Sequence, residues 1–420
     1  MNVYAVIILG ALLFQYGLDL VAQLLNLHAL DEKVPASFEE VYDDDAYRRS
    51  QAYTRANTQF DLIASTFDLG VLLAFWFAGG FAWLDGFVRG WNLGPIWTGL
   101  IYIGALGGAK AVLSLPFQLY STFVLEERFG FNQTSARTFV LDRLKGLGLS
   151  LLLGGPLLAA MLWFFGATGP YGWVYAWVTV TAVVLLLQFA APRYLMPLFN
   201  SFEPVRDDDL RDRILSYARS VDLSVDDVFV MDGSRRSSKS NAFFAGLGAN
   251  RRIVLFDTLL EKLSSTELLT VVAHEVGHYK RHHIPQRIGI SVVHMGVLFL
   301  LLSIFLQVEG LYAAFYVDQI GIYTGLVFFG LLYTPVELLL SLPMQALSRK
   351  HEFEADAFAV KTTGEPEAFT QALKKLAEQN LSNLTPHPFY VQVYYSHPPL
   401  HQRVASIEAQ SPTAAAAGRR

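Results

Sequence analysis

The stretch His274-Glu275-Val276-Gly277-His278 predicts a helix that binds a metal ion. Residues four apart lie on one face of a helix, so both imidazoles can bind the same ion. Glu275 follows the first histidine, where its carboxylate can take a proton from a metal-activated water. Ser264-Ser265-Thr266-Glu267 has the pattern of a capping box and predicts where this helix begins. The alternative is a surface helix that carries two histidines by chance.

The composition is that of a membrane protein. Of the 420 residues, 53% are hydrophobic and 16% are charged, whereas an ordinary soluble domain has about 25% charged residues. The net charge of −5 gives no indication of a nucleic-acid partner. Because the chain has no cysteine, disulfides, thiolate metal ligands and cysteine catalysis are excluded. Any metal ligands must therefore be His, Glu or Asp.

Several apolar runs are long enough, at about 20 residues, to cross a bilayer. A single run of this kind can be a buried helix of a soluble protein, but seven predict an α-helical membrane protein. The fourth and fifth runs are joined by a tight hairpin at Gly166–Gly172. The first run lacks a basic flank and a cleavage site, so we expect it to be retained. The predicted spans are near 3–27, 62–84, 96–119, 147–166, 171–192, 288–308 and 320–342.

The positions of the basic residues predict the orientation in the membrane. The segments after spans one, three, five and seven carry 4, 4, 14 and 8 of the 32 Lys and Arg residues. By the positive-inside rule, these segments are cytoplasmic and the N-terminus is outside.

The predicted domains follow from this arrangement. Residues 1–192 form a membrane domain with five transmembrane helices, and residues 288–342 form a transmembrane hairpin. The hairpin splits one cytoplasmic α+β catalytic domain into the parts 193–287 and 343–412, while 413–420 is a disordered tail. Within the catalytic parts we expect helices near 207–220 and 349–362 and short strands near 227–232, 241–246 and 251–256.

A catalytic zinc usually has three protein ligands, so a third is expected from another cytoplasmic segment. Glu352 and Asp356 are four apart and share a helix face. One can bind the metal while the other accepts the second N–H of a ligand histidine. The alternatives are a solvated acidic face, or a histidine as third ligand: His351, His387, His397 or His401.

Four segments carry a resemblance to a known family: His274–His278, Ser348–Asp356, Leu125–Thr134 and Ser396–Arg403. Together they resemble the M48 family of integral-membrane zinc proteases, in its branch of type I CAAX prenyl endopeptidases. Seven spans and the E-R-F-G-F-N run distinguish that branch from the shorter heat-shock relatives of the HtpX type. The tail Gly418-Arg-Arg lacks the endoplasmic-reticulum retrieval signal expected of many eukaryotic members, so we expect a bacterial inner-membrane protein.

The resemblance implies a role for each site residue. It makes His274, His278 and Glu352 the ligands of one Zn²⁺, with Glu275 as general base. It places Asp356 behind a ligand histidine, and it makes His397 and Arg403 face the reacting carbonyl, where both can donate to an oxyanion. The alternatives are a rigid turn at Pro398-Pro399 and a pairing of Arg403 with an acidic neighbour.

Two further features bear on substrate binding. Asn241 can bond a substrate backbone laid along an edge strand, although a buried hairpin strand explains its segment equally well. The resemblance also implies that the spans enclose a water-filled chamber with zinc at its cytoplasmic end. Charged residues in the spans are expected to face protein or water, because lipid disfavours them. These are Asp61, Asp68, Lys110 and Glu337.

The expected function is a membrane-embedded zincin-like endopeptidase that cleaves prenylated or hydrophobic peptides near their C-terminus. Its partners are then a peptide or protein substrate and the lipid bilayer. The alternatives are a quality-control protease of membrane proteins with an HtpX-like role, and a channel or transporter that has lost catalysis. The complete set of ligands and base argues against the last.

Overall fold

The computed structural model describes residues 1–30, 33–40, 42–245 and 251–410. Within these residues seven helical spans are long and apolar enough to cross a membrane, which confirms the predicted fold class. The predicted tail at 413–420 lies outside the described residues. The spans are built from α1 (Val3–His28), α2 (Asp44–Phe77), α4 (Pro95–Tyr120), α5 (Ala136–Leu149) with α6 (Gly155–Ala167), α7 (Gly172–Ala190), α11 (His283–Phe305) and α13 (Ile322–Thr363).

Three spans continue through short π-helical segments. One of them, η3 (Ser150–Gly154), joins α5 to α6 just before Pro156, which has no N–H to donate to the preceding turn. The spans are therefore longer than the apolar runs alone indicate. The other such segments are η2 (Ser121–Glu126) after α4 and η5 (Ala191–Leu195) after α7; short 3₁₀ turns lie at η1 (Ala36–Phe38), η4 (Gly169–Tyr171), η6 (Met196–Leu198) and η7 (Gly233–Arg235).

The second span differs from the predicted 62–84. Its helix begins at Asp44, where the Asp43 side chain accepts from the Ala46 backbone N–H, and it ends at Phe77. Gly79 then has φ +75°, a left-handed conformation that ends a helix. A separate short helix, α3 (Gly80–Arg89), follows. The hydropathy pattern missed both boundaries because the first half of α2 is polar and α3 is apolar.

The seventh span also differs from the prediction. The expected span 320–342 and the expected helix near 349–362 are one continuous helix of 42 residues, α13. Pro335 and Pro343 lie inside it, as membrane helices tolerate. The helix ends at Gly364, where φ is +70°. The segment that carries Glu352 is therefore a rigid extension of the last membrane helix.

A four-stranded sheet lies at one end of the molecule, in the order β1-β2-β4-β3. β2 and β4 are parallel, and the outer strands are antiparallel to their neighbours. The three predicted strands are present, and Gly246 of the run near 241–246 lies outside the described residues. β1 was not predicted. The strands are β1 (Phe202–Pro204), β2 (Asp227–Met231), β3 (Ala242–Ala245) and β4 (Arg252–Phe256).

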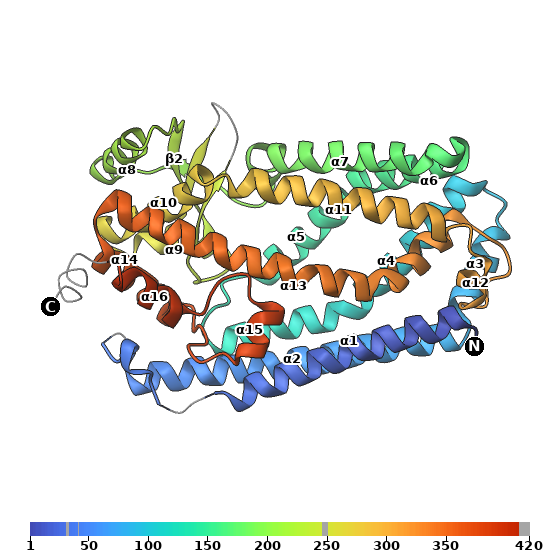
Figure 1. Cartoon of the computed structure of the whole chain (residues 1–420), viewed down its shortest axis with the longest axis horizontal. Coiled ribbons are helices and arrows are strands. Elements are labelled where there is room, and N and C mark those ends of the chain that lie inside the picture. Colours follow the sequence, from blue (N-terminus) through green and yellow to red (C-terminus); the bar gives the residue numbers. More distant parts are fainter. Residues whose placement is uncertain (31–32, 41, 246–250, 411–420) are drawn as a thin grey trace.

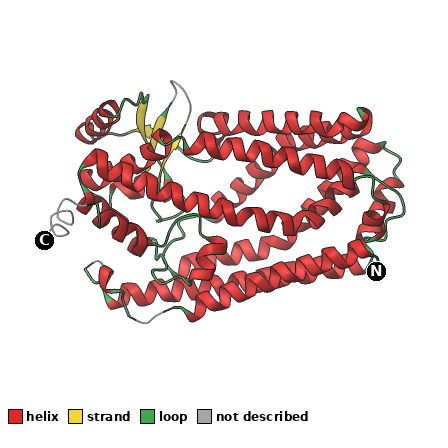
Figure 2. Cartoon of the chain, in the orientation of Figure 1, coloured by secondary structure: helices red, strands yellow, loops and turns green. Residues whose placement is uncertain are grey.

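Helices cover this sheet. Figure 2 shows its strands in yellow beside the red helices that make up most of the described structure. The expected helix near 207–220 is α8 (Asp208–Ser220). The capping box predicted at Ser264–Glu267 starts α10 (Ser265–Lys280), with both of its hydrogen bonds present. The remaining helices are α9 (Asp257–Leu260), α12 (Glu309–Ala313), α14 (Pro366–Gln379), α15 (Pro388–Tyr394) and α16 (Leu400–Glu408).

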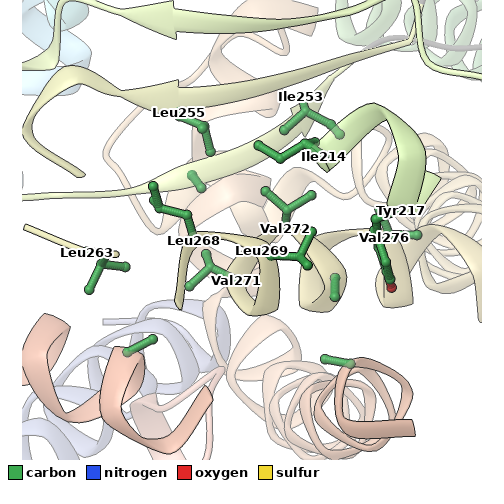
Figure 3. Packing of buried hydrophobic residues seen from close by; sticks show 14 of the residues in the cluster. Ile214, Tyr217, Ile253, Leu255, Leu263, Leu268, Leu269, Val271, Val272 and Val276 are labelled. Carbon is green, nitrogen blue, oxygen red and sulfur yellow. The ribbon is translucent and has the colours of Figure 1, made fainter. Parts of the chain in front are cut away.

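The core of the half that contains the sheet forms around α10. Leu268 and Val272 of α10 and Ile253 and Leu255 of β4 belong to one buried cluster, which Ile214 of α8 completes (Figure 3). Each is at most 2% exposed. Burial of such side chains stabilises by about 1.5–3 kcal/mol each, so α10 is held firmly between the sheet and the helices behind it.

The segment Leu125–Thr134 connects the membrane helices to the half of the molecule that contains the sheet. The backbone of Gln133 donates to the carbonyl of Arg236 over 3.0 Å, and that of Ser238 donates to Phe131 over 3.1 Å. The Arg236 guanidinium also pairs with Asp142 of α5 through two bonds of 2.8 and 3.0 Å. These contacts fix the sheet relative to the third and fourth spans.

Cavities lie between the membrane helices. One of about 1260 Å³ is lined by α4, α5 and α6. Another of about 760 Å³ lies between α11 and α13. Charged side chains of the spans have polar partners: Lys110 pairs with Asp68, and Glu337, which lines the second cavity, has its Oε2 3.3 Å from His294 Nε2.

Candidate metal centre

Three side chains from two helices converge on one point. α10 supplies His274 and His278, and α13 supplies Glu352. The two Nε2 atoms are 3.2 Å apart. Glu352 Oε2 lies 3.4 Å from Nε2 of His274, and Glu352 Oε1 lies 3.3 Å from Nε2 of His278. Of the described residues, these three form the group able to hold a metal ion, with ligand atoms within 4.8 Å of one another.

The donor atoms fit a metal ion. Each histidine uses its Nδ1 for a hydrogen bond elsewhere, so two neutral imidazoles would face each other with bare Nε2 lone pairs, an arrangement that a cation stabilises. Glu352 Oε2 is buried without a hydrogen-bond partner among the described residues. Tetrahedral zinc with Zn–N bonds of about 2.0–2.1 Å sets two nitrogens about 3.3 Å apart.

Gly277 lets the two helices approach closely enough to form this group. A Cβ at this position would lie 3.1 Å from the Cα and carbonyl oxygen of Ala355, a distance at which backbone must move. Ala355 lies three residues after Glu352 on α13. The glycine inside the motif therefore sets the distance between the histidines and the third ligand.

Asp356 and Arg403 lie behind His274. The fully buried Asp356 carboxylate accepts from His274 Nδ1 over 2.8 Å. Arg403 donates to both of its oxygens over 2.8 and 2.6 Å. Burial opposes protonation of His274, but the neighbouring Asp356 and Glu352 carboxylates outweigh burial and raise its pKa to about 9. A positive charge is thus favoured at this position, as a metal ion would supply.

The position of Arg403 favours a role other than the one that the resemblance implies. Its guanidinium is only 12% exposed and is paired with Asp356, which is the alternative that the sequence left open. It lies 3.7 Å from Glu352 Oε2. These contacts place it behind the ligands and engage it with acidic groups. We therefore propose a positioning role for it, in place of donation to the reacting carbonyl.

His397 is in a different situation. Its Nε2 lies 3.4 Å from Glu352 Oε1, while its side chain is 64% exposed. Its Nδ1 is 2.9 Å from the Ser396 hydroxyl. The following prolines lead directly into α16, for which Pro399 is the N-cap. A rigid turn therefore holds an accessible imidazole beside the donor cluster, which consists of His274, His278 and Glu352. Such a turn is compatible with the role that the resemblance implies for His397.

A second set of side chains, in which His283 and His351 are buried, lies behind His278. Its Nδ1 is 3.0 Å from Nδ1 of His283, the first residue of α11. His283 in turn lies 3.0 Å from Glu354 Oε2 and stacks on His351 with ring centroids 3.9 Å apart. The sequence analysis missed His283 entirely. The sequence feature that could have indicated it is a histidine close to the His274–His278 motif, at the start of a membrane span.

The comparisons with known proteins match nearly the whole chain. Residues 23–201 match the family model "CAAX prenyl protease N-terminal, five membrane helices", and residues 204–411 match "Peptidase family M48". CAAX prenyl protease 1 of Saccharomyces cerevisiae is 32% identical, over 96% of this chain and 95% of the relative. A homolog from Arabidopsis thaliana is 34% identical, over 96% and 97%.

The chain belongs to peptidase family M48. Its fold matches the crystal structure of S. mikatae Ste24p with a TM-score of 0.92 and 32% identity, over 97% of this chain and all of that one. The protein is thus a membrane metalloendopeptidase of the CAAX prenyl protease branch. The relatives named here are eukaryotic, so the expected bacterial inner membrane stays a prediction.

In this M48 peptidase, the remaining predicted residues lie apart from the donor cluster. His387 caps α15 through its Nδ1, and His401 is exposed on α16. Asn241 is exposed just before β3, which is at the edge of the described sheet. Its backbone carbonyl accepts from Phe256 over 3.0 Å. β3 packs against α10, where the rings of Phe244 and Tyr279 are 5.5 Å apart.

Proposed function

We propose that this peptidase binds one Zn²⁺ through His274, His278 and Glu352 and cleaves prenylated peptides near their C-terminus. The observation that carries the proposal is the convergence of two bare imidazole nitrogens and an unpartnered carboxylate oxygen on one point. The similarity of the full chain to relatives named CAAX prenyl protease supports the substrate class.

The residues around this point divide the chemistry among them. Zinc, when bound, supplies a Lewis acid and a water of lowered pKa. Burial raises the pKa of Glu275, which the neighbouring His274 and His278 oppose. Glu275 accepts the proton of the attacking water and passes it to the leaving amine. His397, exposed at the site, donates an N–H to the oxyanion that develops on the scissile carbonyl.

The edge of the sheet is the proposed binding surface for the substrate backbone. β3 pairs with β4 on one side, and Asn241 stands exposed at its start. An extended peptide laid along β3 would follow α10 and so pass the donor cluster. The Asn241 amide, whose Oδ1 already accepts from the Ala242 N–H, has no partner for its NH₂ group among the described residues, so this group can donate to a substrate carbonyl.

A cleavage assay with a matched metal analysis tests this proposal. Purified wild type should contain one zinc per chain and cleave a farnesylated C-a-a-X peptide. Glu275→Gln should keep the zinc and lose about 10²- to 10⁴-fold in kcat, since it removes only the base. His274→Ala and Glu352→Ala should lose both. His401→Ala, an exposed histidine away from the cluster, is the control. Equal cleavage of damaged unprenylated membrane proteins would favour the quality-control role.

We also propose that the catalytic end faces the cytoplasm and the N-terminus the opposite side, as the distribution of basic residues predicts. The N-terminus and the sheet lie at opposite ends of the long axis (Figure 1), as this orientation requires. In intact cells, a membrane-impermeant thiol reagent should label Leu93→Cys, beyond α3, and spare Arg213→Cys on α8 until the cells are opened. The reverse pattern would invert the orientation.

A further inference from the structure

The cavity of about 760 Å³ between α11 and α13 begins beside the metal centre. His351 and Ser396 line one end of it, and they are the chain neighbours of Glu352 and His397. From there it extends along both helices into the membrane-spanning part, where Figure 1 shows α11 and α13 side by side. Its walls there are mainly apolar, from Ile290, Val293, Val297, Leu340, Met344 and Leu347.

Its far end is polar. Glu337 and His294 line it, with Glu337 Oε2 3.3 Å from His294 Nε2 and side chains 57% and 30% exposed. A carboxylate exposed to lipid at this depth would be strongly disfavoured. The cavity therefore opens to water inside the protein, and its apolar walls are not a surface that the bilayer covers. An apolar groove that faces water has a driving force to bind an apolar chain.

The substrate class supplies such a chain in the right place. A C-a-a-X peptide carries its prenyl group on the fourth residue from the C-terminus. Cleavage near that terminus leaves the thioether within about three residues, or about 10 Å, of the scissile bond. The mouth of the cavity at His351 and Ser396 meets this requirement. Along α13, Glu337 lies 14 residues from His351, which is about 21 Å at 1.5 Å per residue and is long enough for a farnesyl chain.

We propose that the cavity between α11 and α13 is the binding site for the prenyl chain of the substrate. The thioether lies at His351 and Ser396, the hydrocarbon runs between Val297 and Leu340, and Glu337 with His294 marks its end. This assignment rests on the proposed function. It explains how one enzyme holds a soluble peptide backbone at the sheet and a lipid chain among its spans.

Tryptophan substitutions that fill the cavity test the proposal. Leu340→Trp and Val297→Trp should raise KM for a farnesylated peptide at least 10-fold, with little change in kcat. KM for the same peptide with S-methylcysteine should not change. Leu339→Trp is the matched control, because Leu339 is 68% exposed on the same helix and does not line the cavity. Equal KM values for all three variants and wild type would overturn the site.

Photocrosslinking tests the position directly, without turnover. A peptide with a diazirine on its farnesyl chain is bound to the Glu275→Gln variant, irradiated and mapped by mass spectrometry. Adducts should fall on α11 and α13 between Ile290 and Val297 and between Leu340 and Leu347. Unlabelled farnesyl peptide should displace them and added phospholipid should not. Adducts on α4 and α6, which line the larger cavity, or displacement by phospholipid would overturn the assignment.

The two proposals can fail separately. If wild type cleaves no prenylated peptide, the proposed function fails and the site loses its ligand. If wild type cleaves the farnesylated peptide while Leu340→Trp behaves as Leu339→Trp does, only the prenyl site fails. Circular dichroism and thermal unfolding in detergent show whether each tryptophan variant is folded. The crosslinking experiment uses a protein without these tryptophans, so its result does not depend on the folding controls.

Discussion

His278 Nδ1 lies 3.0 Å from His283 Nδ1, so a metal-facing imidazole is held by another imidazole. If Nε2 of His278 binds the metal ion as proposed, its proton is on Nδ1 and is donated to His283. His283 then carries its own proton on Nε2 and donates it to Glu354 over 3.0 Å. His283 is 1% exposed. The chain Glu354–His283–His278 thus fixes the orientation and tautomer of one proposed ligand, as Asp356 does for the other proposed histidine ligand.

We expect His283→Ala to weaken zinc binding about 10- to 100-fold, the usual effect of losing an outer hydrogen-bond partner of a ligand. Zinc competition with a chromogenic chelator measures this without reference to activity. His401→Ala should bind zinc as wild type does. His283→Gln, which can still accept at its side-chain oxygen, should recover part of the affinity. An unchanged affinity in His283→Ala would show that the contact plays no part in metal binding.

A further prediction separates two roles for Arg403. If it holds Asp356, Arg403→Ala leaves a fully buried carboxylate unpaired, which typically costs about 3–5 kcal/mol. The variant should then unfold at a lower temperature and bind zinc more weakly. Arg403→Lys should recover only part of both, since it lacks the two-bond geometry. A variant with normal Tm and zinc content but a much lower kcat would instead place the guanidinium on the reacting carbonyl.

Gly277→Ala should impair the metal centre although it adds a single methyl group. The new Cβ would lie 3.1 Å from α13 backbone at Ala355, so α10 and α13 must separate by a few tenths of an ångström. We expect a loss of zinc affinity and of activity, measured by chelator competition and peptide cleavage. Gly148→Ala on α5, where nothing lies within 4 Å of the new atom, is the control. Equal behaviour of the two variants would contradict the close-approach argument.

Much of the fold was predictable because its signals are local. The capping box before α10 and the apolar runs depend on neighbours in sequence. The continuity of α13 was not predictable, because the change from apolar to polar residues near Pro343 reads as the end of a span although the helix continues. The pairing of Arg403 with Asp356 joins positions 47 residues apart, and His283 meets its partners only where α10, α11 and α13 converge. Such contacts depend on tertiary packing, which a single sequence does not reveal.

The ion pair between Glu267 and Lys375 predicts how stability depends on pH. Burial alone would raise the pKa of Glu267, but the 2.7 Å bond from Lys375 and the bonds from Ser264 outweigh burial and lower it. Because the folded pKa is below the unfolded one, near 4.3, the stabilisation is complete above that pH. It is lost as the pH falls through the folded pKa.

The Tm difference between wild type and Glu267→Gln in detergent should therefore be largest near pH 7 and shrink below about pH 4. The exposed Glu261 offers a control in Glu261→Gln, whose Tm should follow wild type at every pH. A Tm difference that grows as the pH falls would reverse the sign and exclude this ion pair as its source.

The charges among the spans test whether the interior holds water. The side chains of Asp68 and Glu337 are 47% and 57% exposed, yet both lie on membrane-spanning helices. Since the chain has no native cysteine, Asp68→Cys and Glu337→Cys each provide a single thiol. Both should react with a membrane-impermeant maleimide in purified protein, whereas Ala176→Cys, at a position that is 0% exposed on α7, should not. If both thiols stay unreactive in active enzyme, the spans form a packed bundle, and the substrate must reach the metal centre from the sheet alone.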